Sequence, residues 1–371
     1  MTRARRWLLA ILIGLGVAVA GCGGSGGASL GSVGKPVHLV VGYQPYYTEA
    51  WSALVLRQTG LWKKYLPKGS TVDFQVGLQG SILVGQMLAG KQQVGYMGDM
   101  PAIVGVSKRP IRDLRIVANV GTSPDECGVF LVRRGAPSFS SQTQALQWMS
   151  GKKVAAAQGS CADRVAQTVF NHNDVKPKDY LNQSLDLVTS DFQSGTIDAA
   201  SAWEPVASKL VDAGLAKRVG SGNVDGVDTA AFLVMSEQLI KQRPDVAKDW
   251  LKAELAAERY LADPANAPAI TNMAVGQTKG YSLQEMRDAL YRSWPAAQGG
   301  GADGMKLQLP FTIGSSSMSL IGSDTAFLFK IHSLPTSKLP DGAIDPSLAQ
   351  TVLSQSGDKS PVGVVKATNQ Q

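Results

Sequence analysis

Short β-branched runs alternate with amphipathic segments along the first part of the chain. Residues 37–42 form an apolar run that ends at a glycine and predict a buried strand, and residues 49–65 carry apolar side chains near helical spacing. Residues 72–76 alternate as in a strand, and the small residues after them turn the chain into a predicted helix over 82–88. Residues 94–97 predict the next strand. Strands that alternate with helices predict an α/β fold with mostly parallel sheets covered on both faces.

The middle of the chain repeats this order of elements. Residues 152–157 predict a strand, and a Gln-Gly-Ser turn leads from it into a predicted helix over 161–171. The segment Gly195–Pro205 mirrors Gly90–Pro101, because each runs from a helix-ending glycine through a strand to an acidic residue and a proline that starts a helix. The two segments therefore predict two α/β lobes of similar construction.

The pattern becomes mainly helical after Gly220. Residues 244–261 have helical spacing of apolar side chains, and Ser282 caps a second predicted helix. A Ser/Gly-rich piece over 299–317 separates a final helical stretch, and the polar tail after Gly357 is expected to be loose.

The N-terminal segment predicts export. Three arginines precede fourteen mainly apolar residues over 7–20, which is short of the ~20 residues that cross a bilayer, so residues 1–21 are expected to be a signal peptide. The segment Val-Ala-Gly-Cys ends at Cys22 and resembles a bacterial lipobox, whose cysteine is acylated; the alternative is an ordinary signal peptide with an incidental cysteine. The Gly/Ser-rich residues 22–35 predict a flexible tether. We therefore expect a body that is lipid-anchored at the outer face of the cytoplasmic membrane.

Composition and charge exclude several classes of protein. The chain has 371 residues, enough for about two domains, and its 18% of charged residues excludes a disordered chain or a coiled coil. Without the three N-terminal arginines, 33 basic residues face 29 acidic ones. With no run of Lys or Arg in the body, we expect no nucleic acid partner.

Signals of enzymatic chemistry are sparse. The three histidines, His38, His172 and His332, lie far apart, and neither a metal-ligand cluster nor a nucleophile elbow or a phosphate loop is present in the sequence. We therefore expect no catalytic residue, no metal and no cofactor. Cys127 and Cys161 would fold in an oxidising compartment, where they either form a disulfide or serve as two small buried apolar residues.

Three strand–turn–helix junctions point to the capture of a small ligand. Residues 79–81, 98–101 and 159–161 place free backbone N–H groups at helix starts, where the partial positive charge favours anions. Such junctions gather at the carboxyl ends of parallel strands. Two lobes that face one another with these edges would enclose a binding cleft.

Side chains beside these junctions are the candidate ligand contacts. An aromatic cluster at 43–47 follows the first strand and forms either a pocket wall or packing over the hinge. Trp203 is positioned to stack on a ligand, and Glu204 either accepts from an amine or caps a helix. Arg164 faces either the cleft or solvent, and Asp125 and Glu126 lie near the first crossover between the lobes. The full set of predicted ligand-binding residues is Tyr43, Gln44, Tyr46, Tyr47, Gln79, Gly80, Ser81, Asp99, Met100, Glu126, Ser160, Cys161, Arg164, Trp203 and Glu204.

Four segments resemble a known family. Residues 40–44, 77–101, 151–160 and 195–205 are similar to the substrate-binding proteins of the nitrate/sulfonate/taurine class of ABC importers, a group related to binding proteins for thiamine-pyrimidine precursors. The resemblance covers about residues 36–220. It implies an α/β periplasmic-binding-protein type II fold, with two lobes joined by two crossovers and a ligand cleft between them.

The resemblance also implies where the lobes divide and which residues face the ligand. The first lobe would comprise residues 36–124 and 220–345 and the second residues 125–219, with residues 346–371 as a helix end and loose tail. The family's pocket elements correspond to Tyr43-Gln44, Gln79-Gly80-Ser81, Asp99-Met100, Ser160-Cys161 and Trp203-Glu204. Cys161 departs from the small hydroxyl or alanine expected there, which implies a disulfide to Cys127 near the pocket.

The expected function is therefore that of a monomeric solute receptor, which delivers its ligand to a membrane permease and the permease's ATPase. Helix starts favour a small organic anion such as an alkanesulfonate, and Asp99, Glu126 and Glu204 would favour a zwitterion such as taurine. Three alternatives stay open: a heteroaromatic ligand (a pyrimidine or flavin precursor) stacked between Tyr and Trp, an enzyme on the same fold, and a ligand sensor for a signalling partner.

Overall fold

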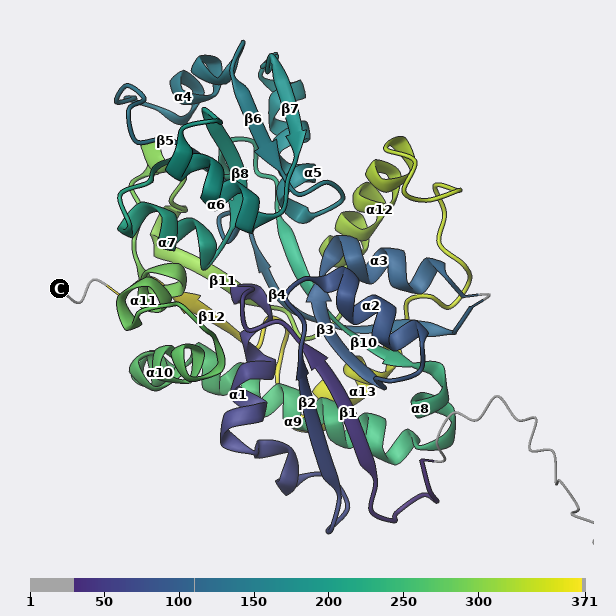
Figure 1. Ribbon diagram of the computed structural model, residues 1–371. Coiled ribbons are helices and arrows are strands. Elements are labelled where there is room, and N and C mark those ends of the chain that lie inside the picture. The colour runs from purple at the N-terminus through teal and green to yellow at the C-terminus, as the bar shows by residue number, and fades with distance from the viewer. Residues whose placement is uncertain (1–29, 110, 369–371) are drawn as a thin grey trace, which may run out of the picture.

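The computed structural model describes residues 30–109 and 111–368, which form two α/β lobes stacked one above the other (Figure 1). The predicted signal peptide and the predicted acylation site at Cys22 lie outside these residues. Within them, no helix combines the length and apolar character that crossing a bilayer requires.

The large lobe is built on a seven-stranded sheet of order β12-β11-β4-β10-β3-β1-β2. Its strands are β1 (His38–Tyr43), β2 (Thr71–Val76), β3 (Val94–Gly98), β4 (Leu114–Ser123), β10 (Thr229–Ser236), β11 (Met305–Leu309) and β12 (Gly363–Lys366). Its helices are α1 (Trp51–Thr59), α2 (Gly80–Leu88), α3 (Asp99–Ser107), α8 (Glu237–Gln242), α9 (Pro244–Ala262), α10 (Ala267–Gln277), α11 (Leu283–Tyr291), α12 (Ser315–Lys330) and α13 (Ser347–Ser356).

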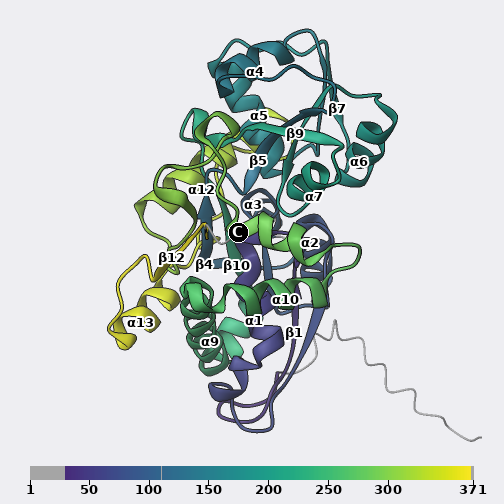
Figure 2. The same cartoon turned by 90° about the vertical axis from the view of Figure 1, so that its left-hand side faces the viewer.

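The small lobe is built on a five-stranded sheet of order β7-β6-β8-β5-β9 (Figure 2). Its strands are β5 (Cys127–Arg133), β6 (Lys153–Ala156), β7 (Asp179–Asn182), β8 (Ala199–Trp203) and β9 (Ala216–Gly220), and its helices are α4 (Gln142–Met149), α5 (Cys161–His172), α6 (Leu185–Ser194) and α7 (Val206–Asp212). The chain enters this lobe between β4 and β5 and leaves it between β9 and β10. The expected α/β architecture of two lobes joined by two crossovers is therefore confirmed.

The expectation of mostly parallel sheets is wrong. Strands β1, β2 and β3 pair in parallel, as do β6, β7 and β8, but β10 runs antiparallel to both of its neighbours and β5 antiparallel to both of its own. Strand β10 enters its sheet from the other lobe, beside the end of β4, where Thr229 pairs with Ser123. Because it starts at the end where β3 and β4 finish, it must run in the opposite direction.

Two further expectations fail at the ends of the chain. Residues 363–366 are not loose, because they form β12 against β11, with Val365 only 2% exposed. Residues 30–35 are not a free tether, because the buried guanidinium of Arg243 donates to the carbonyls of Leu30 and Lys35, each over 2.7 Å. Both ends are ordered although they have few apolar side chains, because the folded body supplies hydrogen-bond partners for their backbone.

Two neighbouring carboxyl groups of α9, those of Glu254 and Glu258, are fully buried in the core of the large lobe. Tyr96 donates to Glu254 over 2.6 Å and accepts from the indole of Trp250 over 2.8 Å. Burial raises the pKa of Glu254 to about 7, and burial together with the nearby Glu254 raises the pKa of Glu258 well above its ordinary value. Folding therefore favours the protonated form of this pair.

We predict that Glu258→Gln stabilises the protein above neutral pH. The pKa of this carboxyl is raised in the folded state, so the stability of the parent protein falls as pH rises from about 4.5. The variant should lose much of this decline and gain on the order of 1–3 kcal/mol at pH 8, measured by urea unfolding at pH 5 and pH 8. The exposed Asp186→Asn serves as the control, and a Glu258→Gln variant that is no more stable than the parent at pH 8 would contradict the cost assigned to burial.

Candidate functional site

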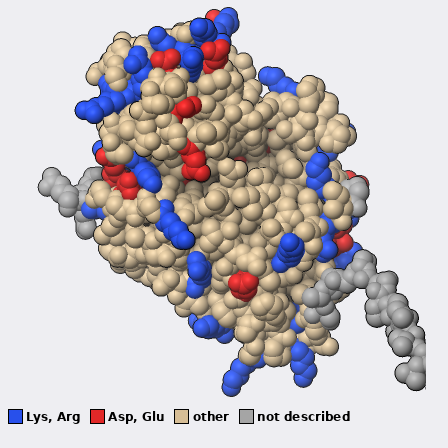
Figure 3. All heavy atoms as spheres, viewed as in Figure 1, with Lys and Arg blue, Asp and Glu red and all other residues tan. Residues whose placement is uncertain are grey.

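A cavity of about 370 Å³ lies between the lobes, a size within the range of ~300–1,000 Å³ that is typical of small-molecule sites. It is lined by Gln44, Tyr47, Gln79, Gly80, Ser81, Val84, Gly85, Leu88, Gly98, Pro101, Val104, Lys108, Ala157, Gln158, Gly159, Ser160, Cys161 and Trp203. Most of these side chains are apolar or uncharged. Figure 3 shows the hollow between the lobes with mainly uncharged residues around it.

Helices α2 and α3 form the wall of the cavity on the large lobe. They pack closely, because a Cβ added at Gly80 would lie 2.4 Å from Pro101 and one added at Gly105 would lie 3.3 Å from Val84. Helix α2 begins after Gln79, and no side chain of the described chain caps its first turn. The backbone N–H groups of Gly80 and Ser81 therefore remain available beside the cavity, whereas that of Ile82 donates to the carbonyl of Gln79 over 3.1 Å.

The start of α5 and the end of β8 form the opposite wall, on the small lobe. Ser160 is the N-cap of α5, and its hydroxyl accepts from the backbone of Asp163 over 3.2 Å and donates to Ala157 over 2.6 Å. Cys161 forms a disulfide with Cys127, which ties the start of α5 to β5. Trp203 ends β8 and is almost fully buried against the cavity. The cavity therefore has one helix N-terminus on each side.

The charges around the cavity favour an anion. None of its described lining residues is acidic, and Lys108 is the basic one among them. Each helix N-terminus adds a partial positive charge of about half a unit. A negatively charged group between α2 and α5 would therefore gain backbone donors mainly from α2, because the carboxylate of Asp163 in the first turn of α5 already accepts from the backbone of Gly159 over 2.9 Å.

The structure brings eight of the predicted ligand-binding residues together at the cavity: Gln44, Tyr47, Gln79, Gly80, Ser81, Ser160, Cys161 and Trp203. Three of the other predicted residues lie away from it. The hydroxyl of Tyr43 contacts Arg57 and donates to Gln277 over 3.0 Å, Tyr46 packs on the ring of Tyr281, and Met100 is buried in the core around α2 and α3.

Arg164 and Asp99 belong to a buried ion-pair cluster that joins the lobes. Arg164 of α5 lies 2.7 Å from Asp324 of α12 and 3.5 Å from Asp99 of α3, and it donates to the carbonyl of Asp228. Burial raises the pKa of Asp324 well above its ordinary value, and it raises the pKa of Asp99, against the attraction of Arg164. The guanidinium therefore neutralises carboxylates of the large lobe and does not line the cavity.

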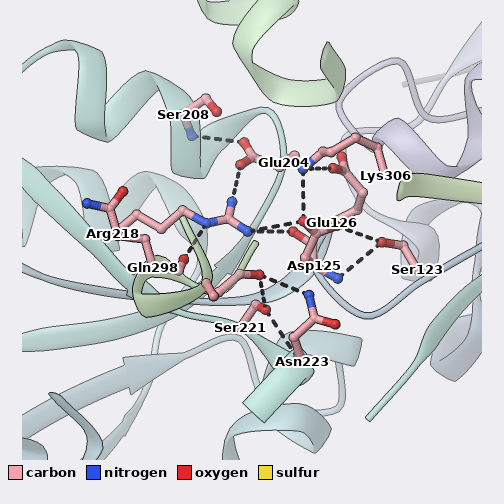
Figure 4. A network of polar contacts seen from close by, with 12 residues as sticks. Ser123, Asp125, Glu126, Glu204, Ser208, Arg218, Ser221, Asn223, Gln298 and Lys306 are labelled. Atoms are coloured by element: carbon pink, nitrogen blue, oxygen red, sulfur yellow. Dashed lines mark hydrogen bonds and ion pairs between the residues drawn. The ribbon is translucent and has the colours of Figure 1, made fainter. Parts of the chain in front are cut away.

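The remaining two acidic candidates form a second buried cluster at the crossovers (Figure 4). Lys306 of β11 lies 2.7 Å from Glu126 and 3.1 Å from Asp125, and Arg218 of β9 lies 2.8 Å from Glu204. Burial raises the pKa of Glu126 to about 8, against the attraction of Lys306.

These contacts concern the carboxylates that were expected to favour a zwitterionic ligand. The three carboxylates expected to hold an ammonium group, Asp99, Glu126 and Glu204, already have cations of the protein as partners.

Several residues that line the cavity were not predicted from the sequence. Val84, Gly85 and Leu88 continue along α2 from Ser81 at helical spacing, and Val104 and Lys108 continue along α3 from Pro101. The periodicity of the predicted helix was a usable signal for this face. The partners Asp324, Arg218 and Lys306 carried no local signal. Across the described residues, no group of His, Cys, Asp and Glu is placed to hold a metal ion.

We predict that Arg164 acts mainly through the fold. Arg164→Met would leave Asp99 and Asp324 buried without a counter-charge, and we expect a loss of about 3–5 kcal/mol in the free energy of unfolding. Adding Asp324→Asn should restore part of this loss, as measured by urea unfolding of both single variants and the double variant.

Arg133→Met is the matched control, because the Arg133–Asp198 pair is exposed, with side chains 45% and 27% accessible. It should cost less than about 1 kcal/mol. A stable Arg164→Met protein that has lost only its ligand affinity would instead make Arg164 a ligand contact.

Comparison with known proteins agrees with this architecture. The family model described as the NMT1-like family matches residues 33–275. The alkanesulfonate-binding protein SsuA from Xanthomonas axonopodis pv. citri, bound to MOPS, is 19% identical with a TM-score of 0.65, over 84% of this chain and 99% of that chain. The nitrate-binding protein NrtA from Synechocystis PCC 6803 is 13% identical with a TM-score of 0.66, over 86% of this chain and 89% of that chain.

An enzyme shares the same fold. A mutant of the desulfurization enzyme DszB, in complex with biphenyl-2-sulfinic acid, is 16% identical with a TM-score of 0.63, over 86% of this chain and 99% of that chain. A comparison with curated proteins finds no match. The expected periplasmic-binding-protein fold is thus confirmed, and the match to the family model over most of the chain shows that the protein belongs to the NMT1-like family.

Proposed function

We propose that this protein is the solute-binding component of an ABC importer and captures a small organic anion of the sulfonate type. The observation that carries the proposal is the cavity between the lobes, which has a helix N-terminus on each side and no acidic residue among its described lining. The folds of SsuA and NrtA support it, because SsuA is named as an alkanesulfonate-binding protein and NrtA as a nitrate-binding protein, and both ligands are small anions. Export by residues 1–21, anchoring at Cys22 and delivery to a permease are parts of the same proposal.

The preferred ligand carries an anionic head and lacks an ammonium group. An ammonium group needs an acceptor, and the nearby carboxylates Asp99, Glu126 and Glu204 are each held by a cation of the protein. Burying an unpaired ammonium group would therefore reduce affinity. Alkanesulfonates fit this requirement better than taurine does.

A binding role is favoured over an enzymatic one. The two cysteines in the described part of this chain, Cys127 and Cys161, are joined in a disulfide. Neither of these cysteines therefore offers a free thiolate for nucleophilic chemistry. The lobes instead offer two walls that a ligand would hold together, which shifts the population toward the closed form.

A ligand screen tests the proposal. The purified protein, in a buffer free of sulfonates, is titrated with butanesulfonate, taurine, nitrate, uracil and riboflavin by calorimetry and thermal unfolding. Butanesulfonate at 100-fold its dissociation constant should add about 2.7 kcal/mol to stability, and taurine should bind more weakly. If only uracil or riboflavin binds, the ligand is heteroaromatic and the proposal of an anionic ligand is wrong. Turnover of any compound would refute the binding role.

Substitutions of Trp203 and Tyr43 test where the ligand binds. We expect Trp203→Ala to weaken butanesulfonate binding by roughly tenfold or more, because a buried aromatic side chain contributes some 1.5–3 kcal/mol. Tyr43→Phe is the matched control, since its hydroxyl faces Arg57 and Gln277 rather than the cavity, and it should leave the dissociation constant unchanged. An unchanged affinity in Trp203→Ala would place the ligand elsewhere.

A further inference from the structure

The cavity continues beyond the two helix N-termini as a groove between α2 and α3. Its lining on α2 runs from Ser81 through Val84 and Gly85 to Leu88, and on α3 from Pro101 through Val104 to Lys108. The stretch of α2 from Ser81 to Leu88 is about 10 Å long. An anionic head at the start of α2 therefore leaves most of the groove unfilled.

The chemistry of the groove changes along its length. Its first part offers backbone donors and the hydroxyl of Ser81, and its middle part is lined by Val84, Val104 and Leu88. Lys108 lies at its far end, at the C-cap of α3. Apolar walls behind an anion-binding end fit a ligand with an apolar chain behind its charged group.

Gly85 lies in the middle of the α2 side of the groove. It lies inside α2 with an ordinary helical backbone, and glycine at such a position destabilises a helix relative to alanine. Close packing accounts for Gly80, whose Cβ would clash with Pro101, but a Cβ added at Gly85 meets no described atom within 4 Å. Packing within the described chain therefore gives no reason for a glycine here, and the free space beside it belongs to the cavity.

We propose that the apolar part of the ligand lies in this groove and that Gly85 determines how long a chain the site accepts. The inference rests on the proposed function, since it assumes an anionic head at the helix N-termini. It narrows the ligand class to anions with an extended alkyl or aryl group, and it makes Gly85 and Val104 specificity-determining residues.

The test compares methanesulfonate, butanesulfonate and octanesulfonate by calorimetry. The parent protein should bind more tightly as the chain lengthens, by about fourfold for each methylene that becomes buried. Gly85→Val should raise the dissociation constant of octanesulfonate roughly tenfold, which is the effect of losing about two buried methylenes. It should change the dissociation constant of methanesulfonate by no more than about twofold. Valine is chosen because a longer side chain in a helix would reach back over Ser81 and obstruct the head of the ligand as well.

Two further variants keep the test decisive. Gly322→Val in α12 is the matched control, because Gly322 is also an exposed helical glycine with no atom within 4 Å of an added Cβ, and it lies outside the cavity lining. It should change none of the three affinities. Val104→Thr keeps the shape of the side chain and replaces one methyl group by a hydroxyl, so it should weaken the binding of octanesulfonate several-fold without affecting that of methanesulfonate, even if Gly85→Val folds poorly.

The outcomes separate the two proposals. If the parent protein binds the three sulfonates equally, or if Gly85→Val weakens all three to the same extent, the groove does not hold the chain and the inference is wrong, while the proposed function stands. If the parent protein binds none of them, the proposed function fails and the inference falls with it.

Discussion

The arrangement of the binding cavity depends on buried charges that meet across the two lobes. Arg164 of the small lobe lies against Asp324 and Asp99 of the large lobe, and Lys306 of the large lobe lies against Glu126 at the first crossover. These contacts fix α5 opposite α3, and with it the second helix N-terminus of the cavity. They also pair Asp99, Glu126 and Asp324 with cations of the protein.

Burying these ion pairs costs free energy, and what they contribute here is the relative position of the two lobes. A buried ion pair loses hydration that its attraction repays only in part, so a well-packed apolar cluster would often be as stable. The cluster at the crossovers has three carboxylates, Asp125, Glu126 and Glu204, and two cations, Arg218 and Lys306. Burial is the main cause of the raised pKa of Glu126, and the nearby Asp125 and Glu204 raise it further against the attraction of Lys306. An apolar cluster would not specify the relative placement of the lobes as sharply.

What the sequence alone could predict was local. The helices at 82–88 and 161–171 and the helix capped by Ser282 were expected within a few residues of their observed bounds, because periodicity and caps act over short distances. Gln79, Gly80 and Ser160 were expected at the cavity because each sits in a strand–turn–helix junction.

The strands and ion pairs that were not predicted depend on partners that lie far away in the sequence. Strand β10 is buried on both faces and lacks the alternation of a half-exposed strand. Its apolar run was therefore included in the region predicted to be mainly helical. Strand β12 is a strand only because β11 lies beside it. Arg164 and Glu204 were predicted as ligand contacts, but each forms a buried ion pair with a residue about 160 or 14 positions away. Local patterns carry no information on such pairings.

The disulfide between Cys127 and Cys161 links the formation of the cavity wall to the compartment in which the chain folds. The bond closes a loop of 34 residues, which is worth about 3–4 kcal/mol in the chain-entropy description. A reducing cytosol does not sustain such a bond. Protein made there and never translocated would hold the start of α5 less firmly against β5, so material produced with and without secretion should differ first in its binding cleft.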